Sequence, residues 1–198
     1  MEANKTKEKS NTIKQNADRV LENLNLRSLL EHYGEVIFTG SYALDTMIWN
    51  DIDLQLKIED PLKEKQILSE ILSKLINSFS IKKVNYIDFY INGRPEMPKG
   101  RYLGLVYWDT LKKEEWKIDL WILAQEDFEK NREFMQKMTT NLVGVLKERA
   151  LDLKAELTDR YGRPPQMASY HIYKCLVEQS PKTDKEVYAY LREQGVDV

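Results

Sequence analysis

Residues 37–57, IFTGSYALDTMIWNDIDLQLK, decide how the rest of the chain is interpreted. This stretch joins an apolar run that ends at Gly40 and Ser41 to a second apolar run that carries Asp51 and Asp53. The pattern predicts a strand, a tight turn, a short helix and a second strand. Aspartate is disfavoured in strands, so two aspartates inside an apolar run require an explanation.

Alternation along the second strand places its acids together. Successive side chains of a strand point to opposite faces, so Asp51, Asp53 and Gln55 share one face and the apolar residues between them share the other. The two carboxylates are then about 7 Å apart along the strand, which suits a divalent cation. The alternative is an acidic, solvent-facing strand that binds nothing. Against this alternative, converging carboxylates raise one another's pKa unless a cation lies between them.

A third acid, Asp119, lies in another apolar run, WKIDLWIL at residues 116–123. In this order the pair Gly40 and Ser41, the Asp51-x-Asp53 motif and Asp119 resemble the signature of the nucleotidyltransferase superfamily of the DNA polymerase beta type. The resemblance extends over residues 35–123 and points to the small bacterial antibiotic-nucleotidyltransferase branch. It implies an α+β fold, in which a small mixed β-sheet is flanked by helices and followed by a C-terminal helical region.

The resemblance also implies an activity. The expected enzyme transfers a nucleoside monophosphate from a nucleoside triphosphate, taken as ATP, to a hydroxyl of a small-molecule acceptor. Its catalytic and metal-binding residues would be Asp51, Asp53 and Asp119. In the family, the first two acids bridge two Mg²⁺ ions and the third binds only the ion beside the acceptor hydroxyl.

Gly40 and Ser41 are the expected phosphate-binding residues. A glycine allows a phosphate to approach the backbone, and free N–H groups at a helix start attract anions. Read structurally, the same pair is a plain turn with a serine N-cap. Many relatives carry a basic residue in this turn, whereas residues 42–50 contain none.

Another part of the chain must therefore supply the positive charge. Lys117 is one candidate because it shares a strand face with Asp119, and Arg160 and Arg163 are two others. The alternative is that each of the three is an ordinary surface charge. Trp121 lies on the Asp119 face as well, and either it or Trp49 could stack on a nucleobase or pack in the core. The expected nucleotide-binding set is Gly40, Ser41, Lys117 and Trp121.

Composition limits the function classes. The 198 residues carry a formal net charge of -2, which argues against nucleic acid or an anionic membrane as the partner. Cys175 is the single cysteine, so an internal disulfide and a cysteine zinc site are excluded and a reducing cytoplasm is expected. No run approaches the roughly 20 apolar residues of a spanning helix. The eight glycines form no phosphate-loop motif.

Periodicity along the chain predicts the remaining elements. Three consecutive strands after the second one favour an antiparallel meander. The helix that precedes them should cover the apolar side of the strand with the two aspartates. The expected order is a disordered segment at 1–11, a helix at 12–33, strands at 35–39 and 51–57, a helix at 61–79, strands at 81–92, 102–108 and 115–123, a loop at 93–100, and helices from 125 onward with a break at 160–165. The expected domains are residues 12–124 and the helical region 125–198.

Two other function classes remain open. The first is an antitoxin-like or protein-nucleotidylating protein of the same fold, for which the charged C-terminal stretch at 180–198 would be a docking element. The second is an RNA-end modifier, which would need locally clustered basic residues. Retention of all three carboxylates argues against an inactive relative. The acceptor, the base and the oligomeric state are not specified by the sequence.

Overall fold

The computed structural model describes residues 2–93 and 97–198, and the chain forms two compact units. The sheet unit consists of Asn16–Thr39 and Asn50–Glu133. The helical unit consists of Met1–Gln15, Gly40–Trp49 and Phe134–Val198. The boundaries between the two units therefore lie inside two helices and on either side of the turn at 40–49. The expected domain boundary after residue 124 stays a prediction.

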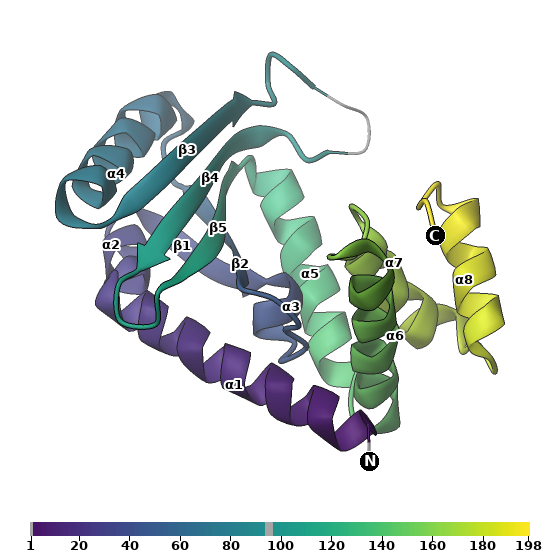
Figure 1. Cartoon of the computed structure of the whole chain (residues 1–198). Coiled ribbons are helices and arrows are strands. Elements are labelled where there is room, and N and C mark those ends of the chain that lie inside the picture. The colour runs from purple at the N-terminus through teal and green to yellow at the C-terminus, as the bar shows by residue number, and fades with distance from the viewer. Residues whose placement is uncertain (1, 94–96) are drawn as a thin grey trace. The chain divides into compact units, whose positions relative to one another are not determined.

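The sheet unit contains one five-stranded sheet with the strand order β1-β2-β5-β4-β3 (Figure 1). Strands β2 and β5 run parallel and the other neighbours run antiparallel, so the sheet is mixed. This arrangement confirms the expected α+β fold and the meander of the last three strands. The strands are β1 (Gly34–Thr39), β2 (Asp51–Ile58), β3 (Ile81–Asp88), β4 (Gly100–Asp109) and β5 (Glu114–Leu123).

Burial in β2 follows the predicted alternation. Ile52, Leu54 and Leu56 are completely buried, whereas Asp51 and Asp53 on the opposite face are only partly buried. The apolar face is part of the core of the sheet unit. The acids of β2 consequently lie on the face where polar chemistry is possible.

The helices of the sheet unit are the end of α1 (Glu2–Asn23), α2 (Leu26–Glu31), α4 (Glu64–Ser78) and the start of α5 (Gln125–Asn141). The single helix expected at 12–33 is divided in two, because Asn25 adopts a left-handed conformation with φ of 45°. A short 3₁₀ turn, η1 (Pro61–Lys63), precedes α4. The apolar face predicted for α4 buries Leu68, Ile71 and Leu75.

The helical unit contains the start of α1, the end of α5 and four further elements. They are α3 (Gly40–Ala43), α6 (Val145–Tyr161), α7 (Ala168–Lys174) with the π-helical turn η2 (Cys175–Gln179), and α8 (Asp184–Glu193). Leu44 packs into their common apolar core and anchors the 40–49 segment there. The helical pattern expected to continue after residue 125 is interrupted before α6 by Gly144, whose φ is 52°.

Two expectations about chain ends and loops need comment. Residues 2–11 were expected to be disordered, but they belong to α1; Ser10 is buried and Lys7 pairs with Glu148 at 3.0 Å. These contacts with distant residues supply the ordering that the local sequence lacks. Part of the loop expected at 93–100 lies outside the described residues. None of the helices in the described ranges combines the length and the apolar composition needed to cross a membrane.

Candidate functional site

The three predicted carboxylates converge on one face of the sheet. Asp51 and Asp53 lie on β2 and Asp119 lies on β5, and one carboxylate oxygen of each lies within 4.8 Å of the other two. The parallel pairing of β2 with β5 causes this, since it sets Asp53 directly opposite Asp119. Residues 66 positions apart in the chain thereby form one acidic cluster, which we call the carboxylate triad.

Lys117 is the positive charge that lies beside the triad. Its Nζ is 2.5 Å from Asp119 Oδ2 and 3.6 Å from Asp51 Oδ1. Burial alone would lower the pKa of Lys117, but the negative charges of Asp51, Asp119 and Asp53 outweigh burial and raise it. The lysine therefore stays an ammonium ion among the carboxylates. Its expected role as a phosphate ligand stays a prediction.

Tyr102 is a site residue that the sequence did not reveal. Its hydroxyl, carried by β4, donates a hydrogen bond of 2.9 Å to Asp119 Oδ1. Burial, and after it the charge of Asp119, raises the pKa of Tyr102 well above its ordinary value, so the hydroxyl remains a donor. The contact depends on the register with which β4 pairs with β5. Side-chain alternation within one strand shows which face a residue occupies but does not show this register.

Trp121 lies two residues beyond Asp119 on the same strand. Its ring centroid is 5.0 Å from that of Phe89, in a stacked arrangement, and 5.0 Å from that of Tyr102. Aromatic pairs at such separations are stabilising. The indole thus already has two aromatic neighbours within the protein, and its expected role in stacking on a nucleobase stays a prediction.

The predicted phosphate-binding pair lies at the start of α3 in the helical unit. Gly40 has a φ of 59°, a left-handed conformation that side chains rarely adopt, which explains a glycine at this turn. Ser41 is buried, and its hydroxyl lies 3.2 Å from the hydroxyl of Tyr173. The serine therefore faces the interior of its unit and does not act as a simple surface N-cap.

Lys154 on α6 is a basic residue that contacts this turn. Its completely buried ammonium group donates to three neutral oxygens: Ser41 Oγ at 2.7 Å, the Thr46 carbonyl at 2.5 Å and the Tyr173 hydroxyl at 2.8 Å. The candidates for this base in the sequence were Lys117, Arg160 and Arg163. Arg160 instead pairs with Glu156 on its own helix, and Arg163 is exposed. Lys154 was missed because it lies 113 residues from Ser41 in the chain.

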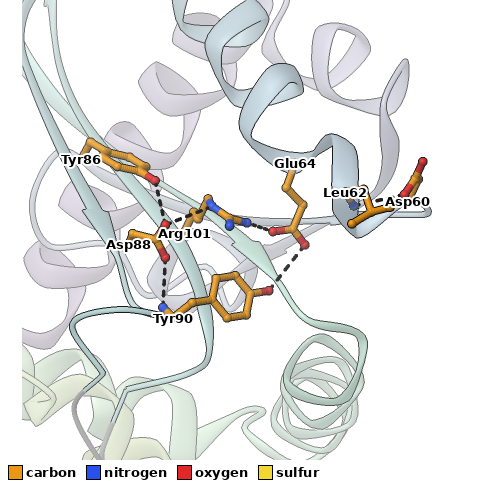
Figure 2. Close-up of polar contacts among 7 residues, drawn as sticks. All are labelled: Asp60, Leu62, Glu64, Tyr86, Asp88, Tyr90 and Arg101. Carbon is orange, nitrogen blue, oxygen red and sulfur yellow. Dashed lines mark hydrogen bonds and ion pairs between the residues drawn. The ribbon is translucent and has the colours of Figure 1, made fainter.

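Asp88, at the end of β3, belongs to a different network (Figure 2). It lies 3.4 Å from Arg101 Nε and accepts hydrogen bonds from the Tyr86 hydroxyl and the Tyr90 amide at 3.3 and 3.1 Å. Arg101 also pairs with Glu64 at the start of α4. Asp88 thus pairs with the partly buried guanidinium of Arg101 and is not one of the three acids of the triad.

This second network borders a cavity of about 750 Å³. Glu64 and Tyr90 line it together with Glu35 of β1 and Lys57 of β2. Lys57 lies near the end of β2, whereas Asp51 and Asp53 lie at its beginning. The cavity and the triad therefore occupy different ends of that strand.

Comparison with known proteins identifies the fold but no sequence relative. No family model matches the chain, and no curated protein matches it in sequence. Two structures of the Cid1 poly(U) polymerase each match 75% of this chain and 43% of the polymerase chain. The MgGTP-bound form has a TM-score of 0.53 and a sequence identity of 15%. A mutant bound to MgATP has a TM-score of 0.54 and a sequence identity of 14%. A form with Mg 3'-dATP bound gives 0.52 at 17% identity.

The chain spans less than half the length of these polymerases. At such low identity the similarity concerns the fold. The chain has a nucleotidyltransferase fold, which confirms the resemblance noted in the sequence.

Proposed function

We propose that this protein is a metal-dependent nucleotidyltransferase that transfers a nucleoside monophosphate from a nucleoside triphosphate to an acceptor hydroxyl. The observation that carries the proposal is the convergence of Asp51, Asp53 and Asp119 within 4.8 Å on neighbouring parallel strands. Three carboxylates that lie together repel one another, so a bound cation stabilises a fold that brings them together. The nucleotidyltransferase fold supports this reading.

The residues of the triad fit divalent cations. Carboxylate oxygens are the ligands that Mg²⁺ prefers, and Asp51, Asp53 and Asp119 would hold it. The ammonium group of Lys117, which lies among the same oxygens, supports the proposal that a cation binds there. When bound, the metal supplies charge neutralisation for the phosphates and makes an acceptor hydroxyl more acidic.

The chain's own residues would take the other roles. The acceptor oxygen forms a bond to the α-phosphorus, the bond to pyrophosphate breaks, and the acceptor proton passes to an Asp119 carboxylate oxygen. Both oxygens of Asp119 already accept hydrogen bonds, from Tyr102 and Lys117, so the carboxylate is held in one orientation. A base held in this way contributes on the order of 10² to 10⁴ in rate.

For the triphosphate we propose Gly40 and Ser41, with Lys154 behind them: its buried ammonium group donates to Ser41 Oγ and would act through that hydroxyl. Gly40 directly follows Thr39, whose Cα pairs with that of Asp53 in the β1–β2 ladder, so the chain continues from the triad strands into this turn. Lys154 supplies the positive charge that residues 42–50 lack. We propose Lys117 and Trp121 as further contacts of the nucleotide, and ATP as the nucleotide.

The proposed acceptor is a small hydroxylated molecule. A net charge of -2 supports it over a long polyanion. An RNA 3' end is the second acceptor to test, because the matched structures are of a poly(U) polymerase. The protein-docking alternative loses one support, since the C-terminal stretch buries Val187 and Leu191 in the core of its own unit.

A transfer assay with α-labelled nucleoside triphosphates and Mg²⁺ tests the proposal. Each of the four triphosphates is offered with pools of small polyhydroxylated compounds, with RNA bearing a free 3' end, and with copurifying proteins. We expect label transfer to one acceptor class, reduced at least 10²-fold by Asp119→Asn. Asp159→Asn, at an exposed carboxylate of α6, is the matched control and should transfer normally. Absence of transfer from every triphosphate to every pool would contradict the proposal.

A further inference from the structure

The orientation of Asp119 depends on two neighbours that contact different oxygens. Tyr102 donates to Oδ1 at 2.9 Å, and Lys117 donates to Oδ2 at 2.5 Å. A cation entering the triad is repelled by the ammonium of Lys117, since both carry positive charge. The neutral hydroxyl of Tyr102 can keep its hydrogen bond while Asp119 binds metal.

Gly104 makes room for this contact. It lies directly opposite Asp119 in the β4–β5 ladder. A Cβ atom at Gly104 would lie 2.4 Å from the Tyr102 hydroxyl oxygen and 2.9 Å from Cζ, so any other residue would displace the end of the tyrosine. The tyrosine ring therefore covers the glycine and reaches along β4 to the acid.

The ring of Tyr102 is itself supported from β5. Trp121, its partner in the ladder, packs against it with centroids 5.0 Å apart, and Phe89 stacks on Trp121. Packing on a large, rigid indole restricts the directions in which the tyrosine hydroxyl can point. The hydroxyl is thus held in place by packing rather than by the carboxylate alone.

We infer that Tyr102 is a positioning residue, which fixes the Asp119 carboxylate for cation binding through its hydroxyl, with Gly104 providing the necessary space. This inference rests on the proposed function of the triad. Hydrogen bonds of this kind to a metal ligand typically affect metal affinity by 10- to 100-fold when they are removed.

Manganese binding to the intact protein, without nucleotide, tests the inference independently of activity. Free Mn²⁺ is counted by electron paramagnetic resonance, and quenching of tryptophan fluorescence gives a second readout. Tyr102→Phe removes the hydroxyl but keeps the ring on Trp121, and we expect about 10-fold weaker Mn²⁺ binding with an unchanged melting temperature. Gly104→Ala keeps the hydroxyl but displaces it, and should give a loss of similar size.

Tyr86→Phe is the matched control, because that tyrosine also donates to a carboxylate, Asp88, outside the triad. It should bind Mn²⁺ like the wild type. Wild-type affinity within two-fold in both Tyr102→Phe and Gly104→Ala would overturn the inference while leaving the triad intact. A wild-type protein that binds no Mn²⁺ would instead contradict the proposed function itself.

Discussion

At the scale of single residues, the site is governed by how charges are compensated. The three carboxylates of the triad lie beside the ammonium group of Lys117. The alternation of Asp51 and Asp53 was predictable, because it depends only on residues adjacent in sequence. The contacts of Tyr102 and Lys154 were not, because each partner comes from another element and depends on strand register or helix packing.

Replacing Lys117 with methionine should make the protein respond more strongly to magnesium. Without the ammonium group, Asp51 and Asp119 lose a partner, so the melting temperature in EDTA should fall. A cation would then no longer be repelled by this ammonium group, so the increase in melting temperature on adding MgCl₂ should exceed that of the wild type. Differential scanning fluorimetry over a MgCl₂ series measures both effects.

Lys82→Met is the control for this experiment. Lys82 pairs with Glu115 at the surface of the same sheet, with both side chains about half exposed. The control should show the wild-type magnesium response. Equal responses in all three proteins would mean that Lys117 does not compete with a cation at the triad.

Replacing Lys154 with methionine should weaken triphosphate binding more than nucleoside binding. The change also removes the Lys154 donor from the buried Thr46 carbonyl, and an unsatisfied buried group costs about 1–3 kcal/mol of unfolding free energy. The Ser41 and Tyr173 hydroxyls keep their contact with one another. Isothermal titration calorimetry with adenosine and ATP, beside a urea titration, separates the two effects.

Lys147→Met, on the same helix, is the matched variant because Lys147 forms a surface ion pair with Asp45. It should be close to the wild type in both measurements. If Lys154→Met loses stability but binds ATP and adenosine in the wild-type ratio, the lysine is purely structural.

At the scale of elements, the strands were predictable and their ends were less so. Strong apolar runs predicted β2 and β5, whose apolar faces are buried; Gln55 and Asp119 on the opposite face are buried as well, which alternation did not indicate. The break at Asn25, where the backbone is left-handed, and the helical start of α1, where Lys7 pairs with the distant Glu148, were not indicated by the periodicity. Strand ends matter here because the hairpin between β4 and β5 sets Gly104 opposite Asp119.

Asp109 at the end of β4 holds this hairpin, and its contribution should depend on pH. Burial would raise the pKa of Asp109, but hydrogen bonds from Arg19 and from the Lys112 and Leu111 amides outweigh burial and lower it. A carboxylate with a lowered pKa in the folded state stabilises the protein above its unfolded pKa of about 3.9, and this contribution disappears as pH falls through the lowered folded value.

Asp109→Asn should therefore be less stable than the wild type by about 3 kcal/mol at pH 7, because it leaves Arg19 without its buried partner. The difference should shrink as pH is lowered below about 4. Urea titrations at several pH values measure it. A difference that is constant from pH 7 to pH 3 would show that the charge of Asp109 is not responsible.

At the scale of the whole molecule, neither compact unit is a continuous stretch of chain. The helical unit needs the start of α1, the 40–49 segment and everything from Phe134 onward. Sequence periodicity placed a boundary after residue 124, because periodicity reports the type of element and not which elements pack together. The burial of Leu44 among residues of α5 to α8 could not be predicted from the turn in which it lies.

Removal of residues 125–198 should consequently leave a chain that does not fold cooperatively. The 40–49 segment would lose the core that buries Leu44, and α1 would lose the partner of Lys7. We expect aggregation on size-exclusion chromatography and no sharp thermal transition by circular dichroism, whereas the full chain should show one. A soluble 1–124 fragment that melts sharply and binds Mn²⁺ would support a domain boundary at that position.

The interleaving of the two units also constrains how such a gene can change. The helical unit has residues at both ends of the chain, so any single recombination point divides it, and any point between residues 16 and 133 divides the sheet unit as well. Neither compact unit can therefore be exchanged between genes as one continuous segment.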